Sequence, residues 1–314
     1  MPTDVWSSLC ARRARRLGAP FKGIAAITGI VIGALAPAPL RADASKSAAQ
    51  QQELDTEHLF GFVEGADIGA PGEKELVNDS TLRAGKASGS YANVASEFEA
   101  KYTALSWLRF SAGGILAYYE AVGVPGIANA DRAGVQSAFV DARLHLLDRE
   151  SAPVGLTLSI EPHWGLLDET SGMPNTHFGL EGVLLLDREL IPDRLVGAVN
   201  LSFANDRTRL LASDGVQRES TVEAGVALAR QLMPGVWLGA EVRYLRNYEG
   251  DALNVFSGQA IYLGPTIHVP LTQKLWASAA FGVQVWGGAV GIPGSLDLVN
   301  FERYQAKIRV GFNF

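Results

Sequence analysis

The C-terminal stretch Tyr304–Phe314 reads YQAKIRVGFNF and carries an apolar side chain at every second position. The positions between these are mostly polar or charged and include Lys307 and Arg309. Side chains of a β-strand point alternately to two faces, so the stretch predicts a strand with one apolar and one polar face. The same alternation recurs from residue 91 onward, for example across residues 154–160, and it indicates an all-β fold.

The connections between the predicted strands alternate between short and long. Short ones fall near residues 103–106, 148–153, 187–192, 231–235 and 270–274, and long ones near residues 123–134, 167–176, 205–218 and 287–300. The short ones recur about every 40–45 residues, which corresponds to one hairpin plus one loop. The chain therefore has room for about six hairpins and about twelve strands, with ten or fourteen as the alternatives.

Two architectures explain such alternation, a soluble β-sandwich and a membrane barrel. The predicted strands of about 10–13 residues are longer than those of most soluble sheets and are long enough to cross a bilayer with tilt. Alternating short turns and long loops are also typical of outer-membrane barrels. We therefore expect residues 73–314 to form a closed, antiparallel, up-and-down transmembrane β-barrel, since lipid leaves no partner for an open sheet edge.

The N-terminal region has the features of an export signal. Basic residues at 12–16 precede an apolar stretch at residues 23–36, which is too short to span a membrane as a helix. A small-x-small site at Ala42–Ala44 predicts a cleaved signal peptide at residues 1–44, and the single cysteine, Cys10, would leave with it. Residues 45–72 are then either a periplasmic segment or a plug that enters the lumen.

Composition and motifs narrow the function. Hydrophobic residues make up 47% of the chain and charged residues 19%, so the chain can bury a core and is not a disordered protein. The net charge of -6 argues against a nucleic-acid partner. The sequence contains no Walker loop, dinucleotide loop, CxxC or HExxH motif. We therefore assign no catalytic residue, cofactor or metal and expect no enzyme activity.

The C-terminal strand resembles the assembly signal of bacterial outer-membrane proteins. The terminal Phe314 is preceded by apolar residues at every second position, and the positions that carry the resemblance are Tyr304, Ile308, Val310, Phe312 and Phe314. The predicted mature chain as a whole resembles the porin-like and transporter-like twelve-stranded barrels of Gram-negative bacteria, many of which have no assigned substrate. The resemblance implies a bacterial outer-membrane location, contact with outer-membrane lipid, recognition by the barrel assembly machinery and passage of small solutes.

Assigning the apolar face to lipid places the other face in the lumen. The predicted pore-lining residues carry both signs of charge and are Glu97, Glu99, Lys101, Arg109, Asp141, Arg143, Glu161, His163, His177, Glu181, Glu223, Glu241, Arg243, Lys307 and Arg309. Folding back the turn at residues 231–235 brings Glu223 close to Arg243. Closure of the barrel brings Lys307 and Arg309 close to Glu75 and Asp79.

These lumen charges have two interpretations. They either line a polar conduit and select solutes, or they fill the lumen with their own salt bridges. Barrels of about eight strands are filled by side chains and those of about sixteen are open, and twelve lies between. We expect a channel for passive or weakly selective passage of small solutes. The alternatives are a non-conducting structural or binding barrel that acts through its extracellular loops and, less favoured, a membrane-embedded enzyme.

Two further groups of residues share the lumen face. Aromatic residues there either form a path for aromatic solutes or fill gaps, and they are Tyr119, Phe139, Trp237, Trp276 and Trp286. Pairing across the loop near residues 167–176 brings His163 close to His177, with Glu161 and Glu181 one step deeper. We interpret these four as polar groups of the lumen rather than as metal ligands.

Overall fold

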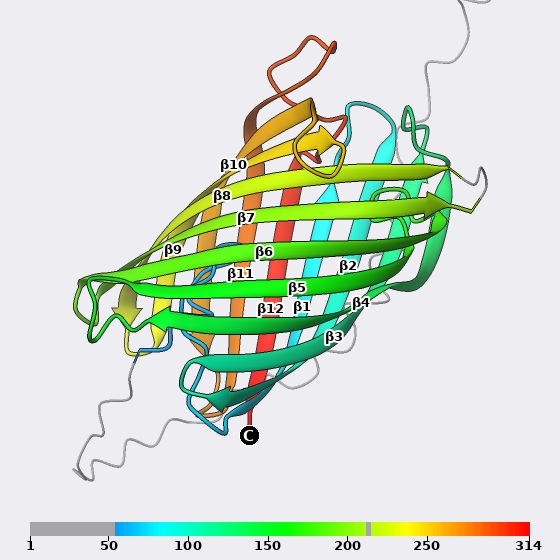
Figure 1. The fold of residues 1–314 in the computed structure, drawn as a ribbon. Coiled ribbons are helices and arrows are strands. Elements are labelled where there is room, and N and C mark those ends of the chain that lie inside the picture. Colours follow the sequence, from blue (N-terminus) through cyan, green and yellow to red (C-terminus); the bar gives the residue numbers. More distant parts are fainter. Residues whose placement is uncertain (1–53, 212–214) are drawn as a thin grey trace, which may run out of the picture. The chain divides into compact units, whose positions relative to one another are not determined.

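A computed structural model describes residues 54–211 and 215–314 (Figure 1). The predicted signal peptide, residues 1–44, lies outside the described residues. Within the described part of the chain, twelve strands form one closed antiparallel barrel, which confirms the predicted fold class and strand number. No helix of the described residues is long and apolar enough to cross a membrane. The strands are β1 Lys74–Ala84, β2 Ser90–Leu105, β3 Leu108–Val122, β4 Ala130–Leu147, β5 Gly155–Leu167, β6 Pro174–Ile191, β7 Leu195–Leu210, β8 Val216–Met233, β9 Val236–Glu249, β10 Val255–Pro270, β11 Leu275–Ala289 and β12 Tyr304–Asn313.

Each strand pairs with its neighbour in the chain, and β12 closes the ring by pairing with β1. In that closing pair Asp79 lies opposite Arg309, and Leu76 lies opposite Phe312. The amide of Phe314 donates to the carbonyl of Lys74 at 3.0 Å. The ring therefore leaves no open sheet edge, as a barrel in lipid requires.

The connections define two ends of the barrel. At the turn end, strands are joined by residues 106–107, 148–154, 192–194, 234–235 and 271–274. At the loop end they are joined by residues 85–89, 123–129, 168–173, 211–215, 250–254 and 290–303. One predicted turn is shifted, because β6 continues to Ile191. Asp187, expected at the start of that turn, lies within the strand and is buried.

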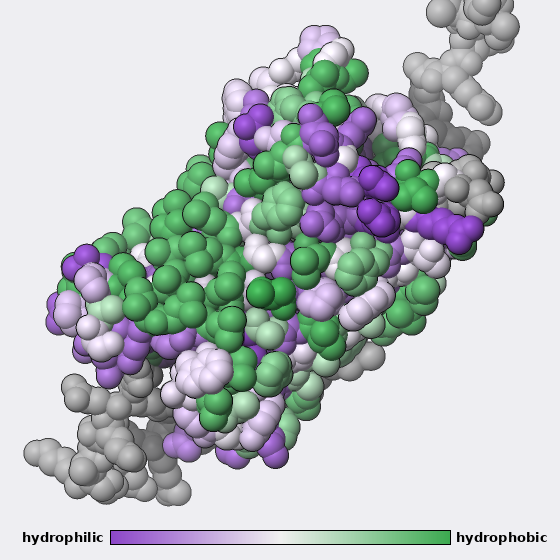
Figure 2. All heavy atoms as spheres, in the orientation of Figure 1, coloured by the Kyte–Doolittle hydropathy of each residue, from purple (hydrophilic) through white to green (hydrophobic). Residues whose placement is uncertain are grey.

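The outward side chains of the strands are mainly apolar and exposed. Leu201, Val226 and Ile308, for example, are 48%, 52% and 57% exposed. Figure 2 shows hydrophobic residues gathered over the middle of one face and hydrophilic residues toward its ends. Such an apolar band is typical of a barrel whose outer surface contacts lipid. The outward positions of β12 include Tyr304 and Phe312, and the exposed Phe314 follows them.

One β-bulge reverses a predicted side-chain direction. The pairing of β10 with β11 shifts register between Ile261 and Tyr262. As a result Val285 and Trp286 are both exposed, at 52% and 45%. The prediction that Trp286 faces the lumen is therefore wrong, because the extra residue interrupts the alternation. The other predicted lumen aromatics are buried within the barrel, namely Tyr119, Phe139, Trp237 and Trp276.

Candidate functional site

The chain before β1 runs through the interior of the barrel, and we call residues 54–72 the lumen segment. Its apolar side chains Leu59, Phe60 and Val63 are almost fully buried. They pack against lumen-facing residues of β7, β8 and β9, which are Val196, Ala198, Ala227, Ala229 and Trp237. Polar contacts of the segment reach β1–β6, β10 and β12, and the ring of His58 stacks on Trp276 of β11. The segment thus touches all twelve strands and crosses the lumen near the turn end.

Glu57 is the main ionic anchor of the lumen segment. Its carboxylate lies 2.7 Å from Lys101 Nζ and also pairs with Arg109 Nη1. Burial alone would raise the pKa of Glu57, but Arg109 and Lys101, with His58 and Arg143, outweigh burial and hold this pKa well below its usual range. Glu57 is therefore a carboxylate near neutral pH, held between cations from β2, β3 and β4.

His58 extends this anchor toward β1 and β11. Its ring stacks on Trp276 with centroids 3.8 Å apart, and its Nε2 lies 3.2 Å from Glu75 Oε2. Burial would lower the pKa of His58, but Glu75 and Glu57 raise it above its ordinary value. The imidazolium form is therefore the one that this pocket stabilises.

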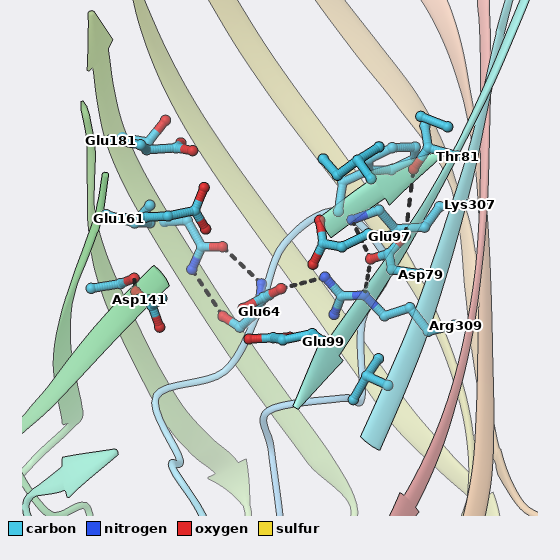
Figure 3. A pocket seen from close by; sticks show the side chains of 18 of the residues that line it. Glu64, Asp79, Thr81, Glu97, Glu99, Asp141, Glu161, Glu181, Lys307 and Arg309 are labelled. Carbon is cyan, nitrogen blue, oxygen red and sulfur yellow. Dashed lines mark hydrogen bonds and ion pairs between the residues drawn. The ribbon is translucent and has the colours of Figure 1, made fainter. Parts of the chain in front are cut away.

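Glu64 spans the centre of the lumen (Figure 3). Its carboxylate lies 2.7 Å from Arg143 Nη2 on β4 and also pairs with Arg309 on β12. The side-chain oxygen of Asn200 on β7 accepts a hydrogen bond from the backbone amide of Glu64 at 2.7 Å. Burial would raise the pKa of Glu64, but Arg143 and Arg309 lower it well below its usual range. Glu64 thereby links opposite walls of the barrel.

Two further side chains, Glu241 and Asp187, hold the backbone of the segment. The amides of Phe62 and Val63 donate to Glu241 Oε2 at 3.0 and 3.2 Å. Near the turn end, the Ala66 amide donates to Asp187 Oδ2 at 2.8 Å. These bonds satisfy backbone groups that lie away from the sheet ladders.

A cavity of about 380 Å³ lies beside the lumen segment. In Figure 3, Glu161, Glu181 and Asp141 line one wall, and Glu97, Asp79, Lys307 and Arg309 line the wall across from it. On the second wall the cations are paired, since Asp79 lies 2.9 Å from Lys307 Nζ and 2.7 Å from Arg309 Nε. On the first wall Glu161 lies directly opposite Glu181 in the β5–β6 register. Arg143 on the same wall pairs with Glu64 and lies 3.5 Å from Asp141, so carboxyl groups outnumber cations on the first wall.

Two inward loops narrow the barrel at the loop end. A second cavity of about 280 Å³ is lined partly by residues 300–302 of the β11–β12 connection. Glu302 in this connection lies 2.8 Å from Lys86 Nζ. In the β5–β6 connection, the Thr170 carbonyl accepts a hydrogen bond from the Tyr91 hydroxyl at 2.8 Å. Glu169 of the same connection lines both cavities.

The predicted lumen residues fall into three groups. Those that line the larger cavity are Glu97, Glu99, Lys101, Asp141, Arg143, Glu161, Glu181, Glu223, Arg243, Lys307 and Arg309. Arg109 and Glu241 instead hold the lumen segment. His163 and His177 lie beside each other with ring centroids 5.9 Å apart. Their third neighbour is Asp206 on β7, a residue that the sequence did not single out.

The predicted pairings hold with one exception. Glu223 lies 3.4 Å from Arg243, and Asp79 pairs with both Lys307 and Arg309. Glu75, however, is not close to these two cations as expected. The register sets Glu75 opposite Asn313, and its carboxylate accepts a hydrogen bond from Trp276 Nε1 at 2.7 Å.

The ionic anchors of the lumen segment were missed by the sequence analysis. Glu57 and Glu64 lie outside every alternating stretch, and their partners are distant in sequence. One signal was present, because β7 and β8 carry apolar residues on the lumen face near the turn end, and residues 59–68 are also rich in apolar side chains. An apolar patch in a polar lumen indicates that something apolar covers it.

The family model described as "Family of unknown function (DUF6662)" matches residues 52–314. Comparison with curated protein sequences gives no match.

Among solved structures, the COG4313 outer-membrane channel of Pseudomonas putida F1 is similar with a TM-score of 0.55 at 11% identity, over 79% of this chain and 98% of that chain. The translocator domain of the autotransporter NalP from Neisseria meningitidis gives 0.49 at 14% identity, over 79% and 91% of the two chains. The toluene transporter TodX of Pseudomonas putida gives 0.38 at 11% identity, over 82% and 94%. The first likeness shows that the chain has the fold of an outer-membrane barrel.

Proposed function

We propose that this chain, which belongs to the family of unknown function DUF6662, is an outer-membrane channel for small solutes that its own lumen segment closes near the turn end. The observation that carries the proposal is the charged cavity of about 380 Å³ beside that segment. A purely structural barrel of this size would gain stability by filling the space with side chains. The shared fold with an outer-membrane channel supports this function.

The charges of the cavity favour small cations over anions. Carboxylates line one wall, and the cations across from them are already paired with Asp79 and Glu64. Charged walls of low dielectric constant raise the local concentration of counter-ions. We therefore assign a weak cation preference to the pore, set by Glu97, Asp141, Glu161 and Glu181.

The membrane orientation follows from the ends of the barrel. In outer-membrane barrels the short turns face the periplasm and the longer loops face the exterior. In this orientation the lumen segment enters from the periplasmic side, where the exported chain also begins. The outer surface would contact outer-membrane lipid, and β12 together with the terminal Phe314 would be read by the barrel assembly machinery.

The second candidate function is a non-conducting barrel that binds partners through its external loops. The observation that favours it is the lumen segment itself, which touches all twelve strands through ion pairs and an apolar cluster. If this segment never leaves, the cavity is sealed from the periplasm. The two functions differ in whether the segment is displaced.

The test is single-channel conductance of the mature chain, residues 45–314, in a planar bilayer beside the variant Glu57→Gln/Glu64→Gln. The variant keeps the shape of both side chains but removes the charges that hold Lys101, Arg109, Arg143 and Arg309. We expect rare, brief openings in the wild type and frequent openings in the variant. A matched control, Glu120→Gln/Asp131→Asn, alters an opposed pair on β3 and β4 that does not line the cavity.

A folded anchor variant that stays as silent as an empty bilayer contradicts the channel. Folding is checked by the shift in electrophoretic mobility on heating, which reports an intact barrel. That outcome would leave the non-conducting barrel as the function.

A further inference from the structure

We propose that His163, His177 and Asp206 form a binding site for a divalent transition-metal cation on the lumen wall toward the loop end. One nitrogen or oxygen atom from each residue lies within 4.8 Å of the others. Two imidazoles and one carboxylate suit Zn²⁺, Co²⁺, Ni²⁺ or Cu²⁺, whereas Ca²⁺ and Mg²⁺ prefer oxygen ligands alone. The site is separate from the ion pairs that hold the lumen segment.

Three adjacent strands supply the ligands. His163 lies on β5, His177 on β6 and Asp206 on β7. His163 Nε2 lies 2.9 Å from Asp206 Oδ1, and the two imidazole rings meet edge to face at 70°. Since the strands are joined by sheet hydrogen bonds, the ligand atoms are held on a rigid frame.

Two glycines make the convergence of the rings possible. In the β5–β6 register Gly165 lies opposite His177, and Gly179 lies opposite His163. A Cβ on Gly165 would lie 1.6 Å from His177 Cε1. A Cβ on Gly179 would lie 2.1 Å from His163 Nε2 and 2.3 Å from Asp206 Oδ1. Each ring therefore lies over a neighbouring strand in space that any other residue would fill.

The surroundings of the two imidazoles also fit metal ligands. The side-chain oxygen of Asn175 lies 3.3 Å from His177 Nδ1 and accepts the proton carried there. This bond leaves the lone pair of His177 Nε2 free for a metal. A metal-binding histidine usually donates its other ring N–H to an acceptor in this way. On the other histidine, Nδ1 faces Glu161 Oε1 at 3.8 Å.

The charge pattern beside the site favours a bound cation. Asp206 lies directly opposite Glu219 on β8, and Glu219 lies opposite Glu249 on β9. Like charges in directly opposed positions destabilise a sheet, so a divalent cation would offset this repulsion.

A second cluster of potential metal ligands already has a cationic side chain as its partner. Glu57, His58 and Glu75 also bring their atoms within 4.8 Å of one another. Lys101 Nζ lies 2.7 Å from Glu57 and 3.2 Å from Glu75, so an ammonium group takes the place that a cation would need. This contrast singles out His163, His177 and Asp206.

The test is titration of the refolded mature chain, made without a polyhistidine tag, with Co²⁺. Co²⁺ bound by nitrogen and oxygen ligands absorbs visible light, and Zn²⁺ displaces it. We expect one equivalent of Co²⁺ with visible absorption bands in the wild type, and loss of these bands in His177→Ala and Asp206→Asn. The control His145→Ala removes another lumen histidine, which bonds Thr157 Oγ1 at 2.9 Å, and keeps the bands.

The variant Asn175→Ala tests the hydrogen bond between Asn175 and His177 Nδ1. We expect it to weaken Co²⁺ binding by about 10–100-fold while one equivalent still binds. A folded wild-type barrel without Co²⁺ absorption overturns the site, and so does unchanged binding in His177→Ala and Asp206→Asn. Because the readout is equilibrium binding, it does not depend on whether the barrel conducts.

Discussion

At the scale of single residues, the carboxylates of the cavity wall set the predicted ion preference. Glu161→Gln/Glu181→Gln replaces two acidic groups of one wall with neutral side chains of the same shape. We expect the reversal potential under a KCl gradient to shift toward zero, because the local potential that concentrates cations is weakened. The mutations are introduced into the variant Glu57→Gln/Glu64→Gln, whose openings are expected to be frequent. Glu120→Gln/Asp131→Asn in the same variant is the control pair. An unchanged reversal potential would place the conducting path elsewhere.

The outer surface gives a second prediction for one residue. Val226 lies midway along β8, faces outward and is 52% exposed. Val226→Lys would place a cation on the lipid face near the midplane, at a cost of about 2–4 kcal/mol. Urea unfolding in phospholipid vesicles measures this loss, and Val226→Leu is the control that keeps the site apolar. Equal unfolding free energies for the lysine and leucine variants would argue against a transmembrane position for β8.

Much of the residue pattern was predictable because it depends only on period two. The inward and outward sets of β8, β9 and β12 follow directly from alternation. Trp286 was mispredicted because a bulge depends on the pairing of two strands, which one strand does not reveal. Asp206 was missed because its role arises only when β5, β6 and β7 are set in register.

At the scale of elements, the lumen segment has a predicted response to acid. The pKa values of Glu57 and Glu64 are held well below the usual range by their arginine and lysine partners. A lowered pKa in the docked state contributes stability above about pH 4.5, and that stability is lost as pH falls through the lowered pKa. We therefore expect the segment to detach in acid.

Thiol labelling can follow this release, because the expected mature chain contains no cysteine. Ala66→Cys places a thiol at a fully buried position of the segment, and Leu271→Cys places one at an exposed turn. Dithiodipyridine, which reacts in acid, should label Ala66→Cys slowly at neutral pH and much faster well below pH 4.5. Labelling of Leu271→Cys should be fast throughout. Equal protection of Ala66→Cys at both pH values, in a folded barrel, would show that the ion pairs do not hold the segment.

The contribution of His58 to the stability of the docked segment has the opposite pH dependence. Its pKa is raised above its ordinary value by Glu75 and Glu57, despite burial. A raised pKa contributes stability that is fully present below about pH 6.5 and is lost as pH rises through the raised value. The segment is thus held most firmly at pH values that are high enough for Glu57 and Glu64 to be ionised and low enough for His58 to be protonated.

The segment also marks the limit of prediction for elements. Strand number and the two ends of the barrel followed from the spacing of turns in the chain. The path of residues 54–72 stayed open between a periplasmic segment and a lumen plug, because it depends on ion pairs such as Glu57–Lys101 and Glu64–Arg143 that join distant parts of the sequence.

At the scale of the whole molecule, the fold separates three tasks. The apolar exterior and the closed ring suit a lipid environment, and in the proposed function the charged cavity is the path that the lumen segment blocks. The central claim is that removal of the segment opens a water-filled path through an intact barrel.

The most direct measurement is therefore planar-bilayer conductance of a chain that begins at residue 73, before and after addition of a peptide spanning residues 45–72. We predict steady, cation-preferring conductance from the shortened barrel and a fall in conductance when the peptide is added, with a weaker fall for the Glu57→Gln/Glu64→Gln peptide. Heat-modified mobility on electrophoresis confirms that the shortened barrel is folded. A folded shortened barrel that passes no current, or a current that the peptide leaves unchanged, would contradict the account.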